Sequence, residues 1–300
     1  MKRRLEFTEL LFKILSYVFL TVLALCCLYP FVYAISASIS VRDAVEEGLI
    51  VLLPKGDEVG NLQFLAFQKV FNDPAFWNSY TNTLFITFYG TLWAMLVAIL
   101  GGYALSKKRL LFRKGFNFFL VFTMWFSAGI VPQYLNYIST QKVFESFGIT
   151  DLKWLVVIAM GMAAMNIILL RNAFEGVPSE IEEAAIVDGA SEFQVLWNVY
   201  IPMSKSTIAT VALFFAISRW NGYFWAQKMI SDPSQHPLQV YLRNQLDFYM
   251  YSEDAPNFPE YSNNSVIYAL IVCSVIPILI IYPFIQKYFA KGVNMGGVKE

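Results

Sequence analysis

The chain of 300 residues is 57% hydrophobic and only 15% charged, and its mean hydropathy is +0.51. Soluble domains carry about 25% charged residues, so this chain has too little polar surface for a soluble protein. Its formal net charge is zero, so no nucleic-acid partner is implied.

Neither cysteine nor histidine indicates a cross-linked or metal-binding protein. The three cysteines, Cys26, Cys27 and Cys273, all lie inside apolar runs, without the spacing of a disulfide framework or a metal site. The one histidine, His236, precedes Pro237 in a polar segment, where a surface position is expected. A single histidine does not make a metal site, so the sequence predicts none.

The first predicted element is a membrane-spanning helix at residues 14–35. It follows a basic, polar segment at 1–13 and lies in a run, residues 14–41, that carries no charged side chain. A helix needs about 20 mostly apolar residues to cross a membrane. A signal peptide is the alternative, because basic residues precede the run. The run exceeds the roughly 7–15 residues of a signal-peptide core, so an uncleaved helix is preferred.

A mixed loop at residues 42–73 separates the first span from the second. Aromatic and apolar residues at 64–71 predict a short helix at the surface of this loop. The second span is predicted at 78–105, in another uncharged run. Small residues in a span let a neighbouring helix approach closely, but they can equally relieve crowding or end the helix. The residues for which both readings stay open are Gly90, Gly101 and Gly102.

A short basic block, residues 107–114, lies between the second span and the third. The third span is predicted at 116–137 and contains Gly129 and Pro132, so we expect its outer end to be irregular or kinked. The fourth span, predicted at 152–170, is the shortest.

The longest hydrophilic stretch between two apolar runs is residues 178–202. Ser179 followed by Glu182, and Ser191 followed by Gln194, each fit a capping box, in which two side chains satisfy free N–H groups at a helix start. The first turn of the first helix is also acidic, which the helix dipole favours. The stretch therefore predicts two short helices.

A turn at Asp188-Gly189 is expected to separate these two helices, because glycine adopts positive φ without strain. The second helix runs through Phe193 and Trp197, and Pro202 ends it or bends the chain. On periodicity alone, the alternative is an ordinary helical hairpin between two larger elements.

Three short motifs stand in this stretch at fixed spacing: Glu183-Ala184-Ala185, Asp188-Gly189-Ala190 and Ile201-Pro202. Together they resemble the EAA loop of binding-protein-dependent ABC importers, and among these the maltose-permease type of sugar importer. Ile201 replaces the usual leucine. Ser206 stands where carbohydrate-type members often have proline, which concerns how the next helix begins.

The resemblance covers nearly the whole chain and implies the type I importer fold. This is an all-α integral membrane protein with six transmembrane helices, both termini in the cytoplasm and a coupling loop between the fourth and fifth. It implies a cytoplasmic segment at 1–13, one permease domain at 14–290, the coupling loop at 172–204 and a Gly-rich basic tail at 291–300. The ATPase-coupling residues it implies are Glu183, Ala184, Ala185, Asp188, Gly189, Ala190 and Pro202.

The resemblance also implies the partners of the chain. They are a second homologous permease subunit, an ATPase dimer, an extracellular solute-binding protein, a sugar substrate and the lipid of a bacterial cell membrane. It implies no cofactor on this chain, with ATP and Mg bound by the partner ATPase. The sequence itself also predicts no ATP or metal site on this chain, because neither a GxxxxGK[ST] phosphate loop nor an HExxH motif occurs in it.

The last two spans are predicted at 207–230 and 265–288, with a polar, proline-containing loop at 231–264 between them. Lysine and arginine in the segments assigned to the inside outnumber those in the outside loops two to one. By the positive-inside rule, both termini and the stretch 172–204 lie in the cytoplasm, where an ATPase would meet it.

Arg219 is the one charged residue deep in a predicted span, where it needs a partner, a wet cavity or backbone carbonyls. Aromatic rings beside amide groups suit a sugar, and the pattern WNxxFW at 220–225 resembles the fifth span of sugar importers. The alternative is that the aromatic residues form an interfacial belt and the amide bridges two helices. The candidate pathway residues are Arg219, Trp220, Asn221, Tyr223 and Trp225.

The predicted function is therefore that of a permease subunit that moves a sugar, with an oligosaccharide favoured, driven by a separate ATPase. Alternatives are a secondary carrier, a non-transporting scaffold, or an ABC importer subunit for another solute. No predicted span contains Asp or Glu, which weighs against proton coupling. The identity of the sugar depends largely on the binding protein and is not predicted.

Overall fold

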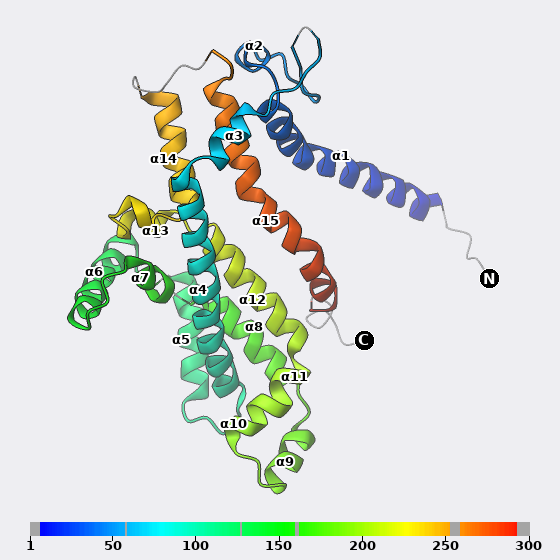
Figure 1. Cartoon of the computed structure of the whole chain (residues 1–300). Helices are drawn as coiled ribbons and strands as arrows, with labels where there is room; N and C mark the ends of the chain where they lie inside the picture. Colours follow the sequence, from blue (N-terminus) through cyan, green and yellow to red (C-terminus); the bar gives the residue numbers. More distant parts are fainter. Residues whose placement is uncertain (1–6, 58, 127, 160–161, 253–258, 293–300) are drawn as a thin grey trace. The chain divides into compact units, whose positions relative to one another are not determined.

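The computed structural model describes residues 7–57, 59–126, 128–159, 162–252 and 259–292. Every regular element within these ranges is a helix, which confirms the predicted all-α class (Figure 1). The chain forms two compact units. The first comprises residues 1–76 and 242–277, and the second comprises residues 77–241 and 278–300. The outer parts of the predicted basic ends, residues 1–6 and 293–300, lie outside the described ranges.

The first unit joins two long apolar helices through short ones. Its core brings Ala37 together with Ala44 and Val45, and the ring of Tyr33 packs edge-on against Tyr268 at 5.4 Å. The predicted short helix at 64–71 is confirmed as α3. The helices of this unit are α1 (Phe7–Ser38), α2 (Arg42–Glu46), α3 (Leu65–Phe71), the larger part of α14 (Leu238–Tyr251) and the first part of α15 (Asn263–Gly292).

The second unit is built around α4, which begins in the first unit and runs on through the second (Figure 1). Its helices in chain order are α4 (Pro74–Ser106), α5 (Arg113–Trp125), α6 (Ile130–Ser146), α7 (Leu152–Ala159), α8 (Ala164–Glu175), α9 (Ser179–Val187), α10 (Glu192–Val195), the π-helical turn η1 (Leu196–Tyr200), α11 (Ile201–Met203), α12 (Lys205–Trp220), α13 (Phe224–Met229) and the 3₁₀ turn η2 (Pro233–Gln235).

By length and composition, three described helical segments are able to cross a membrane unbroken. They are Thr8–Ser38 in α1, Pro74–Ser106 in α4 and Asn263–Ile280 in α15, and they match the predicted first, second and sixth spans. Three further helix pairs pass the same test but are bent. If each bent pair is one crossing, the total is the predicted six.

The third and fourth predicted spans are broken. The third consists of α5 and α6, which meet at 113° around Gly129, whose φ is +84°. This break matches the irregularity expected there. The fourth consists of α7 and α8, bent by 51°.

The predicted fifth span, 207–230, is divided between two helices. α12 ends at Trp220 and α13 begins at Phe224, with the poor helix formers Asn221 and Gly222 between them. At its other end, α12 meets the segment Glu192–Met203 at 86°. The predicted polar loop at 231–264 is also more ordered than expected, because α14 lies within it.

The core of the second unit lies between α4, α8, η1 and α12, where Ala98, Leu170 and Val211 are fully buried. A Cβ at Gly102 would lie 3.0 Å from Leu170 Cβ and 3.1 Å from the backbone nitrogen of Arg171. The role of Gly102 is therefore to let α8 approach α4 closely, rather than to relieve crowding or end the helix. At Gly90 the neighbour is the side chain of Arg219 instead.

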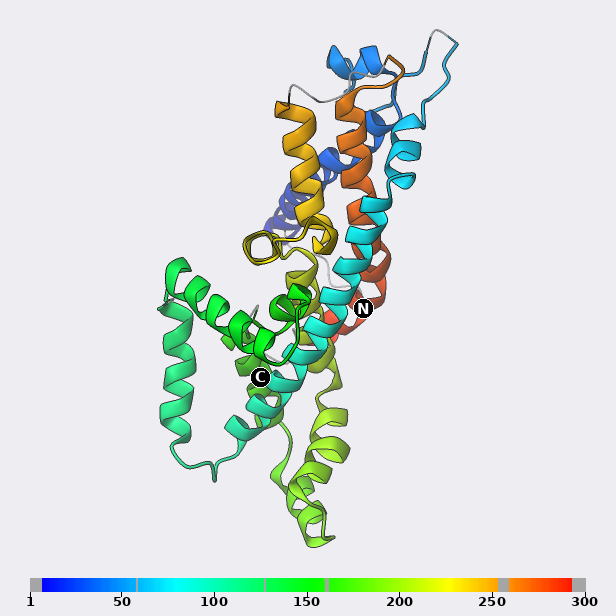
Figure 2. The ribbon, with the colours of Figure 1, turned by 60° about the vertical axis from the view of Figure 1, so that its left-hand side comes forward.

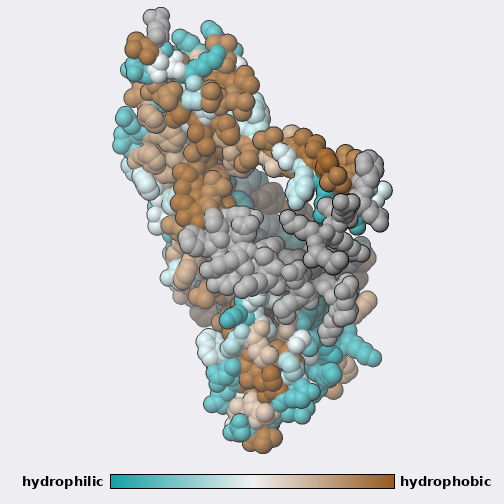
Figure 3. All heavy atoms as spheres, turned by 90° about the vertical axis from the view of Figure 1, so that its right-hand side faces the viewer, coloured by the Kyte–Doolittle hydropathy of each residue, from teal (hydrophilic) through white to brown (hydrophobic). Residues whose placement is uncertain are grey.

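Large apolar side chains are exposed on the long helices, as expected for a surface that meets lipid rather than water. On α1, Phe12 is 71% exposed and Leu25 is 62% exposed. In Figure 3 apolar residues cover wide areas of the surface, whereas hydrophilic residues gather around the lower end, which α9 to α11 help to form.

Candidate functional site

The hydrophilic stretch predicted at 178–202 folds as α9, a glycine turn, α10, η1 and α11, at one end of the second unit (Figure 2). A π-helical turn inserts an extra residue into a helix, and such turns are frequent at functional sites. Here the π turn is followed directly by Pro202 in α11 and by the 86° bend into α12. The stretch is thus a helical elbow between α8 and α12.

α9 begins without the capping box that the sequence predicted. Pro178 is its N-cap, Ser179 is already helical, and no side chain caps the helix start. The prediction of a Ser179–Glu182 box is wrong, because the carboxylate of Glu182 bonds to other partners. Glu180 and Glu182 still make the first turn acidic, as expected from the helix dipole.

The predicted glycine turn and the second capping box are both confirmed. Gly189 has φ +84°, and the N–H of Ala190 donates to the carbonyl of Ala185 at 3.0 Å, which ends α9. The N–H of Ser191 donates to Gln194 Oε1 at 2.7 Å, and the N–H of Gln194 donates to Ser191 Oγ at 3.4 Å.

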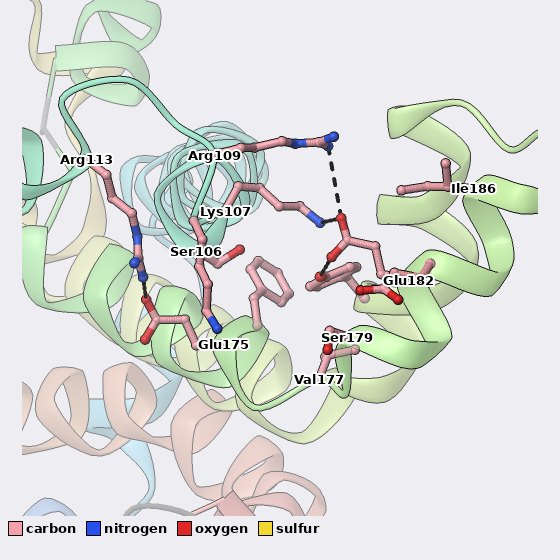
Figure 4. A pocket seen from close by; sticks show the side chains of 13 residues that line it. Ser106, Lys107, Arg109, Arg113, Glu175, Val177, Ser179, Glu182 and Ile186 are labelled. Carbon is pink, nitrogen blue, oxygen red and sulfur yellow. Dashed lines mark hydrogen bonds and ion pairs between the residues drawn. The ribbon is translucent and has the colours of Figure 1, made fainter.

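Glu182 joins α9 to the end of α4 and to η1 (Figure 4). Its Oε1 accepts a hydrogen bond from Lys107 Nζ at 2.6 Å, and its Oε2 accepts one from the Tyr200 hydroxyl at 2.5 Å. Lys107 Nζ also lies over the rings of Tyr200, at 4.0 Å, and Tyr103, at 4.3 Å. Burial alone would raise the pKa of Glu182, but the hydrogen bonds from Lys107 and Tyr200 outweigh burial and hold it below its ordinary value.

A second acidic residue of the elbow reaches the same end of α4. Glu192 of α10 accepts a hydrogen bond from the Tyr103 hydroxyl at 2.9 Å and pairs with Arg109. The basic block that the sequence placed on the inside thus pairs with the acidic residues of the elbow. Sequence reasoning missed this network, since Lys107 and Glu182 lie 75 residues apart and only the fold brings them together.

A cavity of about 680 Å³ opens beside this network. Basic side chains from the α4–α5 connection face acidic ones from α8 and α9 across it, and Arg113 pairs with Glu175 at its edge (Figure 4). Each of these contacts is an ion pair, so the charges in the cavity wall are paired with one another. The cavity therefore does not have the excess of one charge that would bind an oppositely charged ligand.

Apolar side chains project outward from the same hydrophilic elbow. Val187 is 85% exposed, Phe193 is 65% exposed and Trp197 is 61% exposed. The rings of Phe193 and Trp197 stack on each other with centroids 6.2 Å apart. Exposed apolar residues set among charged ones are typical of a surface that meets another protein.

The seven residues predicted for coupling divide into two groups. Glu183, Ala184, Asp188, Gly189 and Pro202 are exposed at the surface of the elbow. Ala185 and Ala190 are half-buried and pack against the core of the second unit. Glu183 also lines the cavity, but the neighbouring carboxylate, Glu182, makes the contacts to α4 and η1.

The residues predicted for the sugar pathway lie at the C-terminal end of α12 and in the turn after it. Arg219 is buried and donates to the carbonyl of Val156 on α7 at 3.3 Å. Trp220 is buried against Tyr80, with ring centroids 6.0 Å apart. The Asn221 amide donates back to its own helix at Ile217.

Tyr223 and Trp225 complete this set. They pack on the core formed by α4, α6, α7 and α13, and Trp225 is edge-on to Tyr137 at 4.8 Å. Among the described residues, no cluster of three or more potential metal ligands occurs.

Comparisons with known proteins converge on one family. The family described as binding-protein-dependent transport system inner membrane component matches residues 7–295. The polygalacturonan/rhamnogalacturonan transport system permease protein YtcP of Bacillus subtilis is 34% identical over 297 residues, which cover 96% of this chain and 98% of that protein. The maltodextrin transport system permease protein MdxG of the same organism is 26% identical over 294 residues, covering 97% and 98%.

A solved structure agrees with these relatives. One chain of a bacterial ABC transporter involved in the import of the acidic polysaccharide alginate matches with a TM-score of 0.81 and 40% sequence identity. The match covers 95% of this chain and 99% of that chain.

Proposed function

The chain belongs to the family of binding-protein-dependent transport system inner membrane components, and on that premise we propose that it is the sugar permease subunit of an ABC importer. The observation that carries the proposal is full-length similarity to two carbohydrate transport proteins, at 34% and 40% identity. Membership in this family removes the secondary carrier and the scaffold that the sequence left open. The carbohydrate relatives favour a sugar, and specifically an oligosaccharide, over another solute.

The chain is a transport subunit, and we propose that its energy comes from a separate ATPase dimer that binds ATP and Mg. An extracellular binding protein delivers the sugar, in keeping with the binding-protein dependence in the family's description. A second homologous permease subunit completes the path. The chain crosses the bacterial cell membrane several times with both termini in the cytoplasm, which the twofold excess of Lys and Arg in the inside segments supports.

The elbow of α9 to α11 is the part that couples this chain to the ATPase. The exposed apolar side chains of Val187, Phe193 and Trp197 support this role, because they would be covered by a docked partner. Glu183 lies on the exposed face and is available to a cation of the ATPase. Gly189 provides the turn between the two docking helices without a side chain at the contact.

Coupling then follows from the rigidity of the elbow. Closure of the ATPase dimer on binding ATP displaces the docked elbow, and the elbow passes this displacement to α8 and α12, to which it is joined by the chain. The path changes from inward-facing to outward-facing. Such rigid-body transmission needs a segment that moves without deforming.

The sugar path runs past the C-terminal end of α12, where Arg219, Trp220, Asn221, Tyr223 and Trp225 lie. The indole N–H of Trp220 supports this proposal, because it is buried without a hydrogen-bond partner among the described residues. A buried, unpaired donor favours a conformational change that brings it a partner, and a sugar hydroxyl in the path would be such a partner.

The coupling role is tested by Gly189→Asp, with Gly189→Asn as the matched control. Both residues tolerate positive φ better than other side chains do, and a Cβ at this position meets no atom within 4 Å. The two variants therefore differ only in a charge placed on the docking face. We expect Gly189→Asp to insert normally and to abolish ATP-driven uptake, with Gly189→Asn less impaired. Near-normal uptake in Gly189→Asp would remove the coupling role.

A further inference from the structure

The chain itself joins the elbow to only two of the helices around it. α9 follows α8 after the short connection 176–178, and α11 leads into α12. α4 ends at Ser106, and more than seventy residues separate it from α9. Movement of the elbow therefore reaches α4 through non-covalent contacts alone.

Two such contacts reach the same end of α4. Glu182 on α9 binds Lys107 and Tyr200, while Glu192 on α10 binds Tyr103 and pairs with Arg109. The two carboxylates lie on either side of the Gly189 turn. The end of α4 therefore contacts both α9 and α10. Rotation of α9 relative to α10 about the Gly189 turn would break either the Glu182 contact or the Glu192 contact.

The Glu182 contact is the stronger of the two because it is shielded from water. The side chain of Lys107 is 10% exposed and that of Glu182 is 18% exposed, against 58% and 53% for Arg109 and Glu192. Charge-assisted hydrogen bonds gain strength as solvent is excluded, whereas exposed ion pairs contribute little. The rings of Tyr103 and Tyr200 cover the Lys107 ammonium and add a cation–π interaction.

We propose that Lys107, Glu182 and Tyr200 form a latch that makes α4 move with the coupling elbow. These are positioning residues, because the contact they make is between the elbow and α4. The inference rests on the proposed coupling role and adds a third driven helix to α8 and α12. The close packing of α4 on α8 at Gly102 is a separate contact, which the latch variants leave intact.

The test uses the complete transporter in proteoliposomes with its binding protein, and the probe is whichever radiolabelled polygalacturonan, maltodextrin or alginate oligosaccharide that binding protein retains. Uptake and ATP hydrolysis are measured on the same sample. The variants are Glu182→Gln, Lys107→Met and their double mutant. The control is Glu180→Gln, which makes the same chemical change in the same turn of α9 at an exposed carboxylate. We expect each single variant to lower the sugar moved per ATP by about tenfold, and the double to be no worse than either single, as for two residues acting as one unit.

A merely structural role would lower uptake and hydrolysis in parallel and leave their ratio unchanged. Ratios in Glu182→Gln and Lys107→Met equal to that of Glu180→Gln would overturn the latch while leaving the proposed function standing. Absence of ATP-driven uptake in the wild-type transporter would instead remove the proposed function, and the latch with it. If Glu182→Gln fails to assemble, Tyr200→Phe, which removes one hydroxyl and keeps the ring, carries the same test.

Discussion

Ionisation of Glu182 governs the contact between α9 and α4 at the scale of single residues. Burial opposes the charge, but the hydrogen bonds from Lys107 and Tyr200 lower the pKa of Glu182 below its ordinary value of 4.5. A carboxyl with a lowered pKa in the folded state contributes stability that is complete above its ordinary pKa. This stability is lost as the pH falls through the folded value.

We therefore expect the thermal stability difference between the wild type and Glu182→Gln to stay constant between about pH 6 and 8. It should shrink only as the pH falls below about 4.5, where the wild-type carboxyl gains its proton. Thermal unfolding of the purified transporter in detergent, followed by intrinsic fluorescence, measures this difference. A difference that already disappears between pH 8 and 6 would contradict the ionisation state described for Glu182.

Trp220 offers a second test at this scale. Trp220→Phe removes the unpartnered indole N–H and keeps an aromatic ring against Tyr80. We expect the initial rate of uptake at saturating binding protein to fall by about threefold to tenfold, the value of one hydrogen bond to a sugar hydroxyl. Trp154→Phe is the control, because Trp154 packs on Phe85 and Tyr89 instead. Equal losses in both variants would remove Trp220 from the path.

The motif predicts a functional role for the carboxylate of Glu183, but it is the carboxylate of Glu182 that contacts Lys107 and Tyr200. Local pattern alone assigned Glu182 to a capping box with Ser179. A capping hydrogen bond is weak beside a shielded contact to an ammonium and a phenol, so the tertiary partners prevail. By contrast, Gly189 and the Ser191–Gln194 box were predictable, because backbone geometry a few residues away decides both.

At the scale of helices, two adjacent glycines of α4 make a matched pair. A methyl group at Gly102 would lie 3.0 Å from Leu170 Cβ and 3.1 Å from the nitrogen of Arg171, whereas at Gly101 it meets only Ile167 Cγ2 at 3.6 Å. Replacing glycine by alanine within a helix otherwise stabilises it by about 0.5–1 kcal/mol. We expect Gly101→Ala to be neutral or stabilising.

Gly102→Ala should lose stability instead, because overpacking costs about 1–3 kcal/mol and exceeds the gain in helix propensity. Thermal unfolding of the two variants side by side gives the sign directly. Equal melting temperatures would contradict the close packing of α4 on α8 at Gly102.

Hydropathy located the six apolar runs but not the breaks inside them. An apolar run continues through a bend without a change in composition, so α7 and α8 were indistinguishable from one helix. Local signals existed at the other breaks, namely Gly129 and the pair Asn221-Gly222. The prolines of residues 231–264 predicted a loop there, but they lie on either side of α14 and leave that helix uninterrupted.

At the scale of the whole molecule, family and general function were predictable, because the three motifs of the elbow occur at fixed spacing. The identity of the sugar was not predictable from these motifs. The relatives include transport proteins described for polygalacturonan/rhamnogalacturonan and for maltodextrin, and the alginate importer supplies the structural match. Oligosaccharides from these three classes therefore form the panel to be tested.

The role of this chain as an ABC permease subunit is tested by purifying it from its native membrane in mild detergent, identifying the subunits that accompany it and assaying their ATPase activity. We expect to recover an ATPase and a second homologous permease, with hydrolysis stimulated by one binding protein loaded from the oligosaccharide panel. Recovery of the chain alone, as a stable unit that still carries sugar in liposomes without ATP, would contradict it.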